Sequence, residues 1–241
     1  MVSRVVVVGA RGAIGAALLR ELSRRHPGAE LHAVVRSSAN QEQSPSIYQW
    51  HEVNFDSPSS IEKVANSISS RGKIDRVIVC IGLLHHREFS PEKNIAQLNH
   101  FQFEMCFKVN TTYPAMIAKY FLSHLDKDKK SIFAVLSARV GSISDNRLGG
   151  WYSYRASKAA LNMVIKNIAI ERARVSKHNV IVALHPGTVD SRLSKPFQAR
   201  VKPEKLFSPE QSAGYLLDVL DQLEFDDSGN CLAWDGSSIA P

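Results

Sequence analysis

Short apolar runs alternate with longer segments of helical pattern along this chain of 241 residues. The first run, at 5–8, is four consecutive valines, as expected of a strand buried on both faces of a sheet. Similar runs lie at 31–35, 48–53, 77–81, 132–136, 180–184 and 231–234, and helical patterns separate them at 14–25, 59–70, 103–125, 152–175 and 209–223. This alternation predicts right-handed βαβ units on a parallel sheet.

The same pattern contains no domain boundary, internal repeat or low-complexity tract. A chain of this length suits one domain with a sizeable core, so we expect a single α/β domain over residues 1–241. The predicted fold class is a doubly wound parallel sheet of about seven strands with helices on both faces. Polar stretches at 37–46 and 193–206 are predicted loops, and the second follows a strand end, where a lid over a ligand could lie.

The chain is basic, with 30 Lys and Arg residues, 23 Asp and Glu residues and a net charge of +7. A basic balance is typical of proteins that bind nucleic acid or membrane surfaces. Here the densest basic runs, 24–26, 126–130 and 171–178, read as polar helix ends, and no recognition motif accompanies them. We therefore favour solvated surface over a nucleic-acid patch, and an anionic cofactor would explain part of the charge.

The three cysteines, Cys80, Cys106 and Cys231, form no C-x-x-C pair. This usage favours reduced thiols, without zinc or disulfides. The first strand follows the initial Met too closely for a signal peptide, and no apolar run approaches the ~18 residues of a membrane span. We expect a cytoplasmic protein with no metal and no membrane contact.

Residues 9–15, Gly-Ala-Arg-Gly-Ala-Ile-Gly, directly follow the first predicted strand and open the first predicted helix. In this context a glycine-rich turn binds a dinucleotide, with the pyrophosphate on free N–H groups of the helix N-terminus. Gly9 permits the tight turn, Gly12 lets the backbone approach the pyrophosphate, and Gly15 lets the helix lie close to the sheet. The alternative is an ordinary glycine-rich turn, and its position at the first strand favours the cofactor.

The end of the second strand indicates which nicotinamide cofactor would bind. An acidic residue there binds the 2′-hydroxyl of NAD, whereas an arginine suits the 2′-phosphate of NADP. Residues 34–38 contain Arg36 and no carboxylate, and Arg11 in the glycine turn supplies a second guanidinium group. We therefore expect NADP(H) rather than NAD. The alternative for Arg36 is a surface residue that caps a strand.

Tyr154 and Lys158 are four residues apart on a predicted helix, so they share one helical face. A phenol normally titrates near ~10, and a neighbouring cation favours its phenolate form. The pair is therefore a candidate for proton transfer near neutral pH. This spacing is a weak signal alone and gains its weight from the glycine turn upstream.

Further motifs accompany these two: Asn110 within 108–111, a strand that ends in Ser137, and Pro-Gly-Thr-Val-Asp-Ser at 186–191. Together they resemble the short-chain dehydrogenase/reductase family over almost the whole chain. Segments 137–146 and 149–158 look like its C-factor-like branch. The resemblance implies a single-domain Rossmann fold, hydride transfer between NADP(H) and a carbonyl or alcohol substrate, and a homodimer or homotetramer.

The resemblance also implies roles for single residues. Tyr154 would be the general acid in carbonyl reduction and the base in alcohol oxidation. Lys158 would lower the pKa of Tyr154 and bond the nicotinamide ribose, and Asn110 would hold a water that links Lys158 to solvent. Substrate loops are expected around 83–100, 138–152 and 191–207. The residues expected to contact the cofactor, besides Tyr154 and Lys158, are Gly9, Arg11, Gly12, Ala13, Ile14, Gly15, Arg36, Asn54, Phe55, Gly82, Pro186, Gly187, Thr188, Val189 and Ser191.

The largest departure from the family pattern is the absence of the serine that binds the substrate oxygen, because its position falls on Ala138. Ser137 and Ser142 are the candidates to supply the missing hydroxyl. Loss of one such donor can cost ~3 kcal/mol of transition-state stabilisation. Smaller departures are Ala13 at a usual glycine position and Asn54 at the position of a usual acid.

The Ala138 departure also fits a second hypothesis, a C-factor-like signalling or regulatory protein that binds NAD(P) with little turnover. Intact Asn110, Tyr154 and Lys158 favour the enzyme. A third hypothesis, nucleic-acid binding, has no motif to support it.

Several ring side chains have more than one interpretation. His85 and His86 follow a predicted strand end, where they could contact a substrate or belong to an ordinary loop. Trp151 could line a pocket, lie in the core or face a second subunit. His185, which precedes Pro186, is expected to pack near the cofactor rather than to catalyse.

Overall fold

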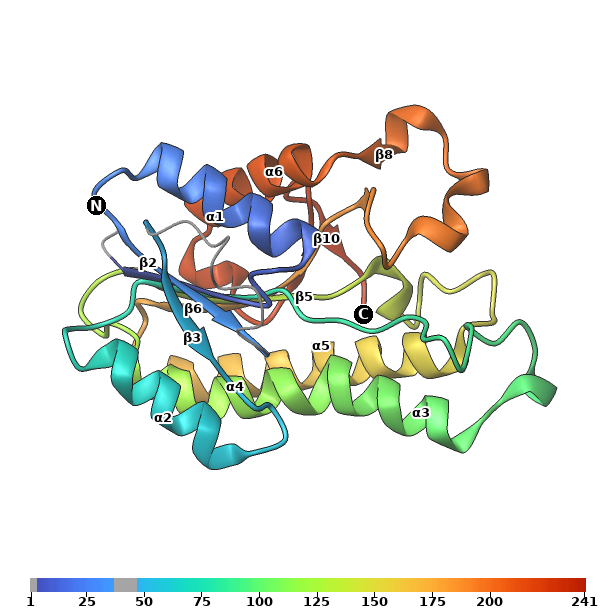
Figure 1. Ribbon diagram of the computed structural model, residues 1–241, viewed down its shortest axis with the longest axis horizontal. Coiled ribbons are helices and arrows are strands. Elements are labelled where there is room, and N and C mark those ends of the chain that lie inside the picture. The colour runs from blue at the N-terminus through green and yellow to red at the C-terminus, as the bar shows by residue number, and fades with distance from the viewer. Residues whose placement is uncertain (1–3, 37–46) are drawn as a thin grey trace.

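An eight-stranded sheet runs through the middle of the protein, for which a computed structural model describes residues 4–36 and 47–241 (Figure 1). Its strand order is β10-β9-β6-β5-β4-β1-β2-β3, and every neighbouring pair is parallel except β9 with β10. The strands are β1 (Arg4–Val8), β2 (Glu30–Val35), β3 (Gln49–Glu52), β4 (Arg76–Val79), β5 (Ser131–Leu136), β6 (Asn179–His185), β9 (Cys231–Ala233) and β10 (Ser238–Ile239). The predicted parallel sheet of seven strands is confirmed, with β10 as an antiparallel addition at one edge.

Helices cover both faces of this sheet, as predicted for a doubly wound fold (Figure 1). One face carries α1 (Ala13–Arg25) and α6 (Pro209–Gln222). The other carries α2 (Pro58–Ser69), α3 (His100–Phe107), α4 (Tyr113–Phe121) and α5 (Tyr152–Ala173). Alternate residues of the central strands enter the two apolar layers; for example, Val6 and Val8 face α2 and α5, whereas Val5 and Val7 face α1 and α6.

The long helix predicted at 103–125 contains a π-helical turn, Lys108–Thr112, between α3 and α4. Pro114 gives the physical reason. In a regular α-helix the N–H of residue 114 would donate to the carbonyl of Asn110, and proline has no N–H. The chain instead adopts the wider turn, in which the N–H of Tyr113 donates to the carbonyl of Lys108. Asn110 lies inside this turn and is fully buried.

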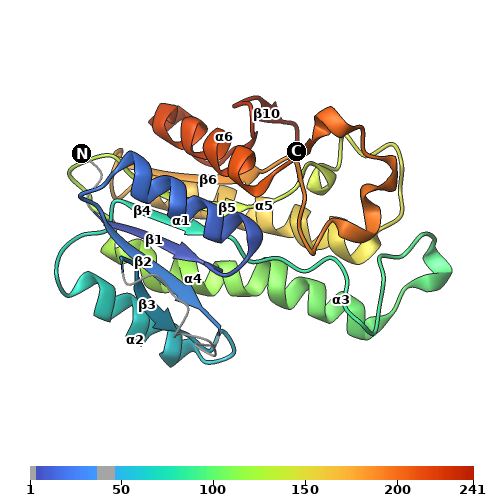
Figure 2. The same ribbon diagram turned by 45° about the horizontal axis from the view of Figure 1, so that its top comes forward.

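The parallel strands bring their carboxyl ends to one edge of the sheet, where β1 lies between β4 and β2 (Figure 2). The chain reverses its winding direction at this point, which is where doubly wound sheets bind ligands. A small sheet of β7 (Thr188–Val189) and β8 (Leu206–Phe207) stands beyond the same edge. It encloses 3₁₀-helices at Lys195–Arg200 and Pro203–Lys205, within the stretch predicted as a loop.

The loop predicted at 37–46 lies outside the described residues. No helix in the described ranges has an apolar stretch that could cross a membrane.

Candidate active site

Three adjoining cavities follow the carboxyl edge of the sheet. The outer groove, of about 420 Å³, is lined by residues that include Gly9, Arg36 and Tyr113. The middle groove, of about 510 Å³, extends from Arg36 to Tyr154. The inner pocket, of about 240 Å³, lies beyond Tyr154 under the 3₁₀-helices. Tyr154 lines both the middle groove and the inner pocket, so it stands at their junction.

The glycine turn forms the floor of the two grooves. Gly9 has a φ angle of +83°, a conformation that favours glycine, and its N–H donates to the carbonyl of Val34 at 2.9 Å. At Gly15 an added Cβ would collide with the carbonyl of Gly9, so the close approach of α1 to the sheet requires glycine there. Both reasons match the sequence-based interpretation.

The N-terminus of α1 suits an anionic ligand. Its cap residue, Gly12, offers no side-chain acceptor, and the first turn contains no acidic residue. The N–H groups and the positive end of the helix dipole are therefore available to a phosphate. Ala13 and Ile14 line the middle groove, and Arg11 and Arg36 line both grooves.

The far end of the outer groove is aromatic. The ring of Phe55 stacks on that of Tyr113 with centroids 5.4 Å apart, and both residues line the groove. Asn54 lies outside the three cavities, and its Oδ1 accepts a hydrogen bond from the N–H of Asp56 at 3.0 Å. Of the two neighbours expected near an adenosine, Phe55 is therefore at the groove and Asn54 is not. Tyr113, which the sequence reasoning missed, lies three residues after Asn110 in the same helical segment.

Tyr154 and Lys158 lie in the first turns of α5, as predicted, and both side chains are buried. Nζ of Lys158 donates to the carbonyl of Leu136 at 2.9 Å and lies 5.9 Å from the centroid of the Tyr154 ring. Burial lowers the pKa of Lys158 to about 8.

The expected net lowering of the pKa of Tyr154 is not found in this structure, in which the phenol has a raised pKa. Burial of the phenol has the largest effect and raises its pKa, and the neighbouring thiol of Cys106 acts in the same direction. A spacing of four residues places both side chains on one face of the helix, but it does not indicate how deeply that face is buried from solvent. Tyr154 therefore remains a protonated phenol at neutral pH.

Asn110 joins the loop after β4 to helix α5. Its Oδ1 accepts from the N–H of Leu83 at 2.7 Å, and its Nδ2 donates to the carbonyl of Leu83 at 2.8 Å and to Oγ of Ser157 at 3.0 Å. Gly82 lies directly beside it: an added Cβ would be 3.7 Å from Oδ1 of Asn110 and 3.9 Å from Nζ of Lys158. Three distant segments thus meet here, and the predicted water between Asn110 and Lys158 remains a prediction.

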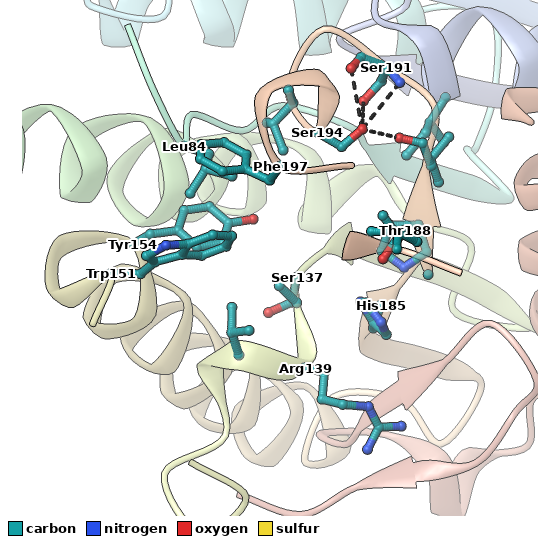
Figure 3. Close-up of a pocket in the computed structure, with 18 residues that line it drawn as sticks. Leu84, Ser137, Arg139, Trp151, Tyr154, His185, Thr188, Ser191, Ser194 and Phe197 are labelled. Carbon is teal, nitrogen blue, oxygen red and sulfur yellow. Dashed lines mark hydrogen bonds between the residues drawn. The ribbon is translucent and has the colours of Figure 1, made fainter. Parts of the chain in front are cut away.

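The inner pocket has a mainly apolar wall around Tyr154 (Figure 3). The ring centroid of Trp151 lies 6.2 Å from that of Tyr154 and 5.1 Å from that of Phe197. Leu84 lies beside them, from the first predicted substrate loop. Sequence reasoning left Trp151 open and missed Phe197, whose position depends on the fold of the 3₁₀ segment.

The two candidate serines have different surroundings. Ser137 lines the pocket, but its hydroxyl donates to Oδ1 of Asn162 at 2.7 Å. Ser142 lies outside the inner pocket and the grooves, and its hydroxyl donates to the carbonyl of Pro241 at 3.3 Å while accepting from the N–H of Asp145 at 3.1 Å. Ser142 is therefore not retained as a candidate.

The end of β6 and the segment after it form the wall opposite Tyr154, where His185 and Thr188 are seen in Figure 3. Gly187 has a φ angle of +77°, and an added Cβ would lie 2.6 Å from the Phe207 ring. All the residues predicted from this segment, Pro186, Gly187, Thr188, Val189 and Ser191, line the inner pocket. Burial, followed by the charge of Arg139, lowers the pKa of His185 to about 4, so its ring is neutral at neutral pH.

The two histidines after β4 differ in their contacts. His85 reaches the segment after β7, with Nε2 3.1 Å from the carbonyl of Arg192 and its ring 5.8 Å from that of Phe197. His86 pairs with Glu88 at 3.3 Å, on the exposed part of the loop. Within residues 4–36 and 47–241, no group of His, Cys, Asp and Glu side chains could hold a metal ion.

Comparisons with known proteins agree with this geometry. The 1-hydroxy-2-glutathionyl-2-methyl-3-butene dehydrogenase of Rhodococcus sp. (strain AD45) is 31% identical over 239 residues, which are 98% of this chain and 99% of that protein. The C-signal of Myxococcus xanthus is 29% identical over 133 residues, covering 55% of this chain and 75% of that protein. The resemblance to the C-factor-like branch is thereby confirmed.

The solved structure of NADPH-bound carbonyl reductase from chicken fatty liver has the same fold, with a TM-score of 0.86 and 23% identity over 100% of this chain and 94% of that one. A family model for short chain dehydrogenases matches residues 3–202. With the glycine turn and the Tyr154–Lys158 pair at one edge of a doubly wound sheet, the chain belongs to the short-chain dehydrogenase/reductase family of oxidoreductases.

Proposed function

We propose that this protein is an NADP(H)-dependent reductase of carbonyl compounds. The observation that carries the proposal is the place of Tyr154, at the junction of a long groove and a separate apolar pocket. A dinucleotide in the two grooves would run from Phe55 to Tyr154, and a carbonyl compound in the inner pocket would meet the phenol from the other side.

The grooves suit a nicotinamide dinucleotide with a 2′-phosphate. The uncapped N-terminus of α1 would receive the pyrophosphate, and Arg11 and Arg36 would bind the 2′-phosphate. The solved relative from chicken fatty liver binds NADPH, which supports this choice.

The proposed chemistry uses groups that the fold already orients. When bound, NADPH would supply the hydride to the carbonyl carbon. Tyr154, kept protonated by burial, would give its phenolic proton to the carbonyl oxygen, and the cationic Lys158 would stabilise the phenolate that remains. Asn110 would hold helix α5 at a fixed distance from the loop after β4.

The pocket wall favours an uncharged substrate with an apolar body. Leu84, Trp151 and Phe197 provide one side, and the pocket volume of about 240 Å³ suits a small molecule. Because Ala138 provides no hydroxyl, the carbonyl oxygen would depend on Tyr154 more strongly than in relatives with a serine there.

The test is a titration of the purified protein with NADPH and with NADH, followed by thermal unfolding. A ligand that binds the native state raises the melting temperature, and we expect the larger rise with NADPH. Oxidation of NADPH is then measured with small aromatic and aliphatic aldehydes and ketones. Tyr154→Phe should keep the NADPH-induced rise and lose roughly 10²–10⁴-fold in kcat. No rise with either nucleotide would overturn the proposal.

A second candidate function rests on Ala138. A C-factor-like signalling or regulatory protein that binds NADP(H) has no need of a substrate-oxygen donor, so Ala138 favours that reading. It would give the same thermal shift with NADPH but no turnover that depends on Tyr154.

A further inference from the structure

We propose that Glu92, in the loop between β4 and α3, is a positioning residue that fixes the start of helix α5 and thereby aims Tyr154. Glu92 is 1% exposed and lies 61 positions before Ser153, its partner on α5. The catalytic part of this inference rests on the proposed reductase function, whereas its structural part does not.

The contacts of Glu92 enclose the first turn of α5. The N–H of Ser153 lies 3.3 Å from Oε2 and 3.4 Å from Oε1 of Glu92, and the Ser153 hydroxyl donates to Oε1. The main-chain carbonyl of Glu92 accepts from the N–H of Trp151 at 2.5 Å. Both the side chain and the backbone of Glu92 therefore bind residues that flank the helix start.

Helix α5 has no local device that could do the same. Its cap residue, Trp151, has a φ angle of +52° and makes no side-chain cap hydrogen bond, and the first turn contains no acidic residue. A carboxylate at a helix N-terminus satisfies free N–H groups and interacts favourably with the helix dipole. Glu92 supplies these interactions from another part of the chain, as a remote cap.

The position of this cap matters because Ser153 directly precedes Tyr154, and Trp151 is part of the pocket wall. The negative charge of Glu92 also adds to burial in raising the pKa of the Cys106 thiol, on α3, to about 12. A helix start released from Glu92 would move the phenol relative to Lys158, which is held deeper by the carbonyl of Leu136.

The kinetic test compares Glu92→Ala and Glu92→Gln with a matched control, Glu88→Ala, whose side chain is exposed on the same loop. Each variant is assayed for kcat and KM of the carbonyl compound and for the dissociation constant of NADPH. A displacement of about 1 Å at a reacting group can cost 10²-fold. For Glu92→Ala we therefore expect kcat/KM to fall by about 10–10²-fold with an unchanged NADPH constant. Glu92→Gln keeps one acceptor oxygen and should recover part of the loss.

A second measurement does not need turnover. Hydrogen exchange of a peptide that covers 150–158 should speed up in Glu92→Ala, while a peptide from 160–172 keeps its protection. Ser153→Ala removes the hydroxyl partner of Glu92 and leaves the N–H of residue 153 in place. Once Glu92 is replaced by Ala, loss of this hydroxyl should add nothing, so the double variant Glu92→Ala/Ser153→Ala should match Glu92→Ala in exchange and in kcat/KM.

Unchanged exchange at 150–158 together with kcat and KM equal to those of Glu88→Ala would overturn the proposal. A loss of activity only in proportion to the fraction of protein that binds NADPH would also overturn it, because that result shows unfolding rather than misplacement. If the wild-type protein turns over no carbonyl compound, the proposed function fails, and the exchange experiment still decides whether Glu92 holds the helix start.

Discussion

The hydroxyl of Ser137 donates its hydrogen bond to Oδ1 of Asn162, a residue of α5, at 2.7 Å. The proton of Ser137 is thus engaged by the helix, although the residue lines the pocket. The next residue, Ala138, lines that pocket with only a methyl group. This arrangement predicts that position 138 limits the proposed reduction.

Ala138→Ser should therefore increase turnover. The residue is in extended backbone at the pocket surface, so a hydroxyl there has room to approach a carbonyl oxygen. Because one such donor is typically worth about 10²-fold in kcat, we expect a gain of about tenfold or more, measured as NADPH oxidation at saturating carbonyl compound. Ser137→Ala should instead lower the free energy of unfolding by about 1 kcal/mol and leave kcat unchanged. Equal turnover in wild type and Ala138→Ser would show that another group holds the substrate oxygen.

Arg36→Ala should remove much of the preference for NADPH over NADH. A hydrogen-bonded charge pair contributes about 1.5–3 kcal/mol, so the NADPH dissociation constant should rise by about 10–10²-fold while that of NADH stays the same. Isothermal titration with each nucleotide measures both constants. Arg71→Ala is the charge-matched control, because Arg71 is exposed and lies beside Glu30 at the start of β2, the end of the strand opposite Arg36. If the dissociation constants of NADPH and NADH rise by the same factor, Arg36 does not contact the 2′-phosphate.

Carbonyl reduction should lose rate as the pH rises through about 8. Below that pH Lys158 is a cation, which stabilises the phenolate formed at Tyr154; above it the charge is lost because burial has lowered the lysine pKa. Tyr154 stays protonated across this range, since its own pKa is raised. The profile of log kcat/KM against pH should therefore show one descending limb near 8. If kcat/KM instead stays constant to well above this pH, the positive charge of Lys158 is not needed for the reaction.

Stability should decrease in mild acid because of His32. Burial, followed by the neighbouring His51, lowers its pKa from 6.5 to about 4. Above 6.5 the ring is neutral in both states, so this contribution to stability is fully present. As the pH falls from 6.5 to about 4, the unfolded chain takes up a proton that the native ring does not, and stability is lost.

Thermal unfolding over a pH series checks this expectation. His32→Gln should flatten the acid limb in part, since burial also lowers the pKa of His51 and His185. His100→Gln, at an exposed position of α3, should leave the limb as it is. An identical slope in wild type and His32→Gln would contradict the assignment.

Much of the fold could be predicted because its central strands are buried on both faces. Four consecutive valines at 5–8 strongly favour a buried strand. The need for glycine at positions 9 and 15 follows from the turn that these residues form, so it could also be predicted from the local sequence. The strand β10 could not be found this way, because two residues carry no periodic signal. The π-helical turn around Asn110 could have been predicted from Pro114, which has no N–H to donate within the helix. The spacing of apolar residues, on which the helix prediction rested, contains no information about a missing N–H.

The site was only partly predictable for a similar reason. The spacing of Tyr154 and Lys158 placed them on one face, yet the direction of the tyrosine pKa depends on burial under Trp151 and Leu84. Those two residues come from loops whose shapes are set by tertiary contacts. The hydrogen bonds between Glu92 and Ser153 link residues 61 positions apart. Helical and strand periodicities relate only residues close in sequence, so they could not predict this contact.

The π-helical turn at Lys108–Thr112 gives the chain an unusual sensitivity to length. Such a turn holds one residue more per ring than an α-turn, and Asn110 lies inside it. Deleting or inserting a single residue within Lys108–Thr112 would change which residue of the turn faces the end of β4. Asn110 would then no longer meet Leu83, and the loop after β4 would lose its anchor although every remaining side chain keeps its chemistry.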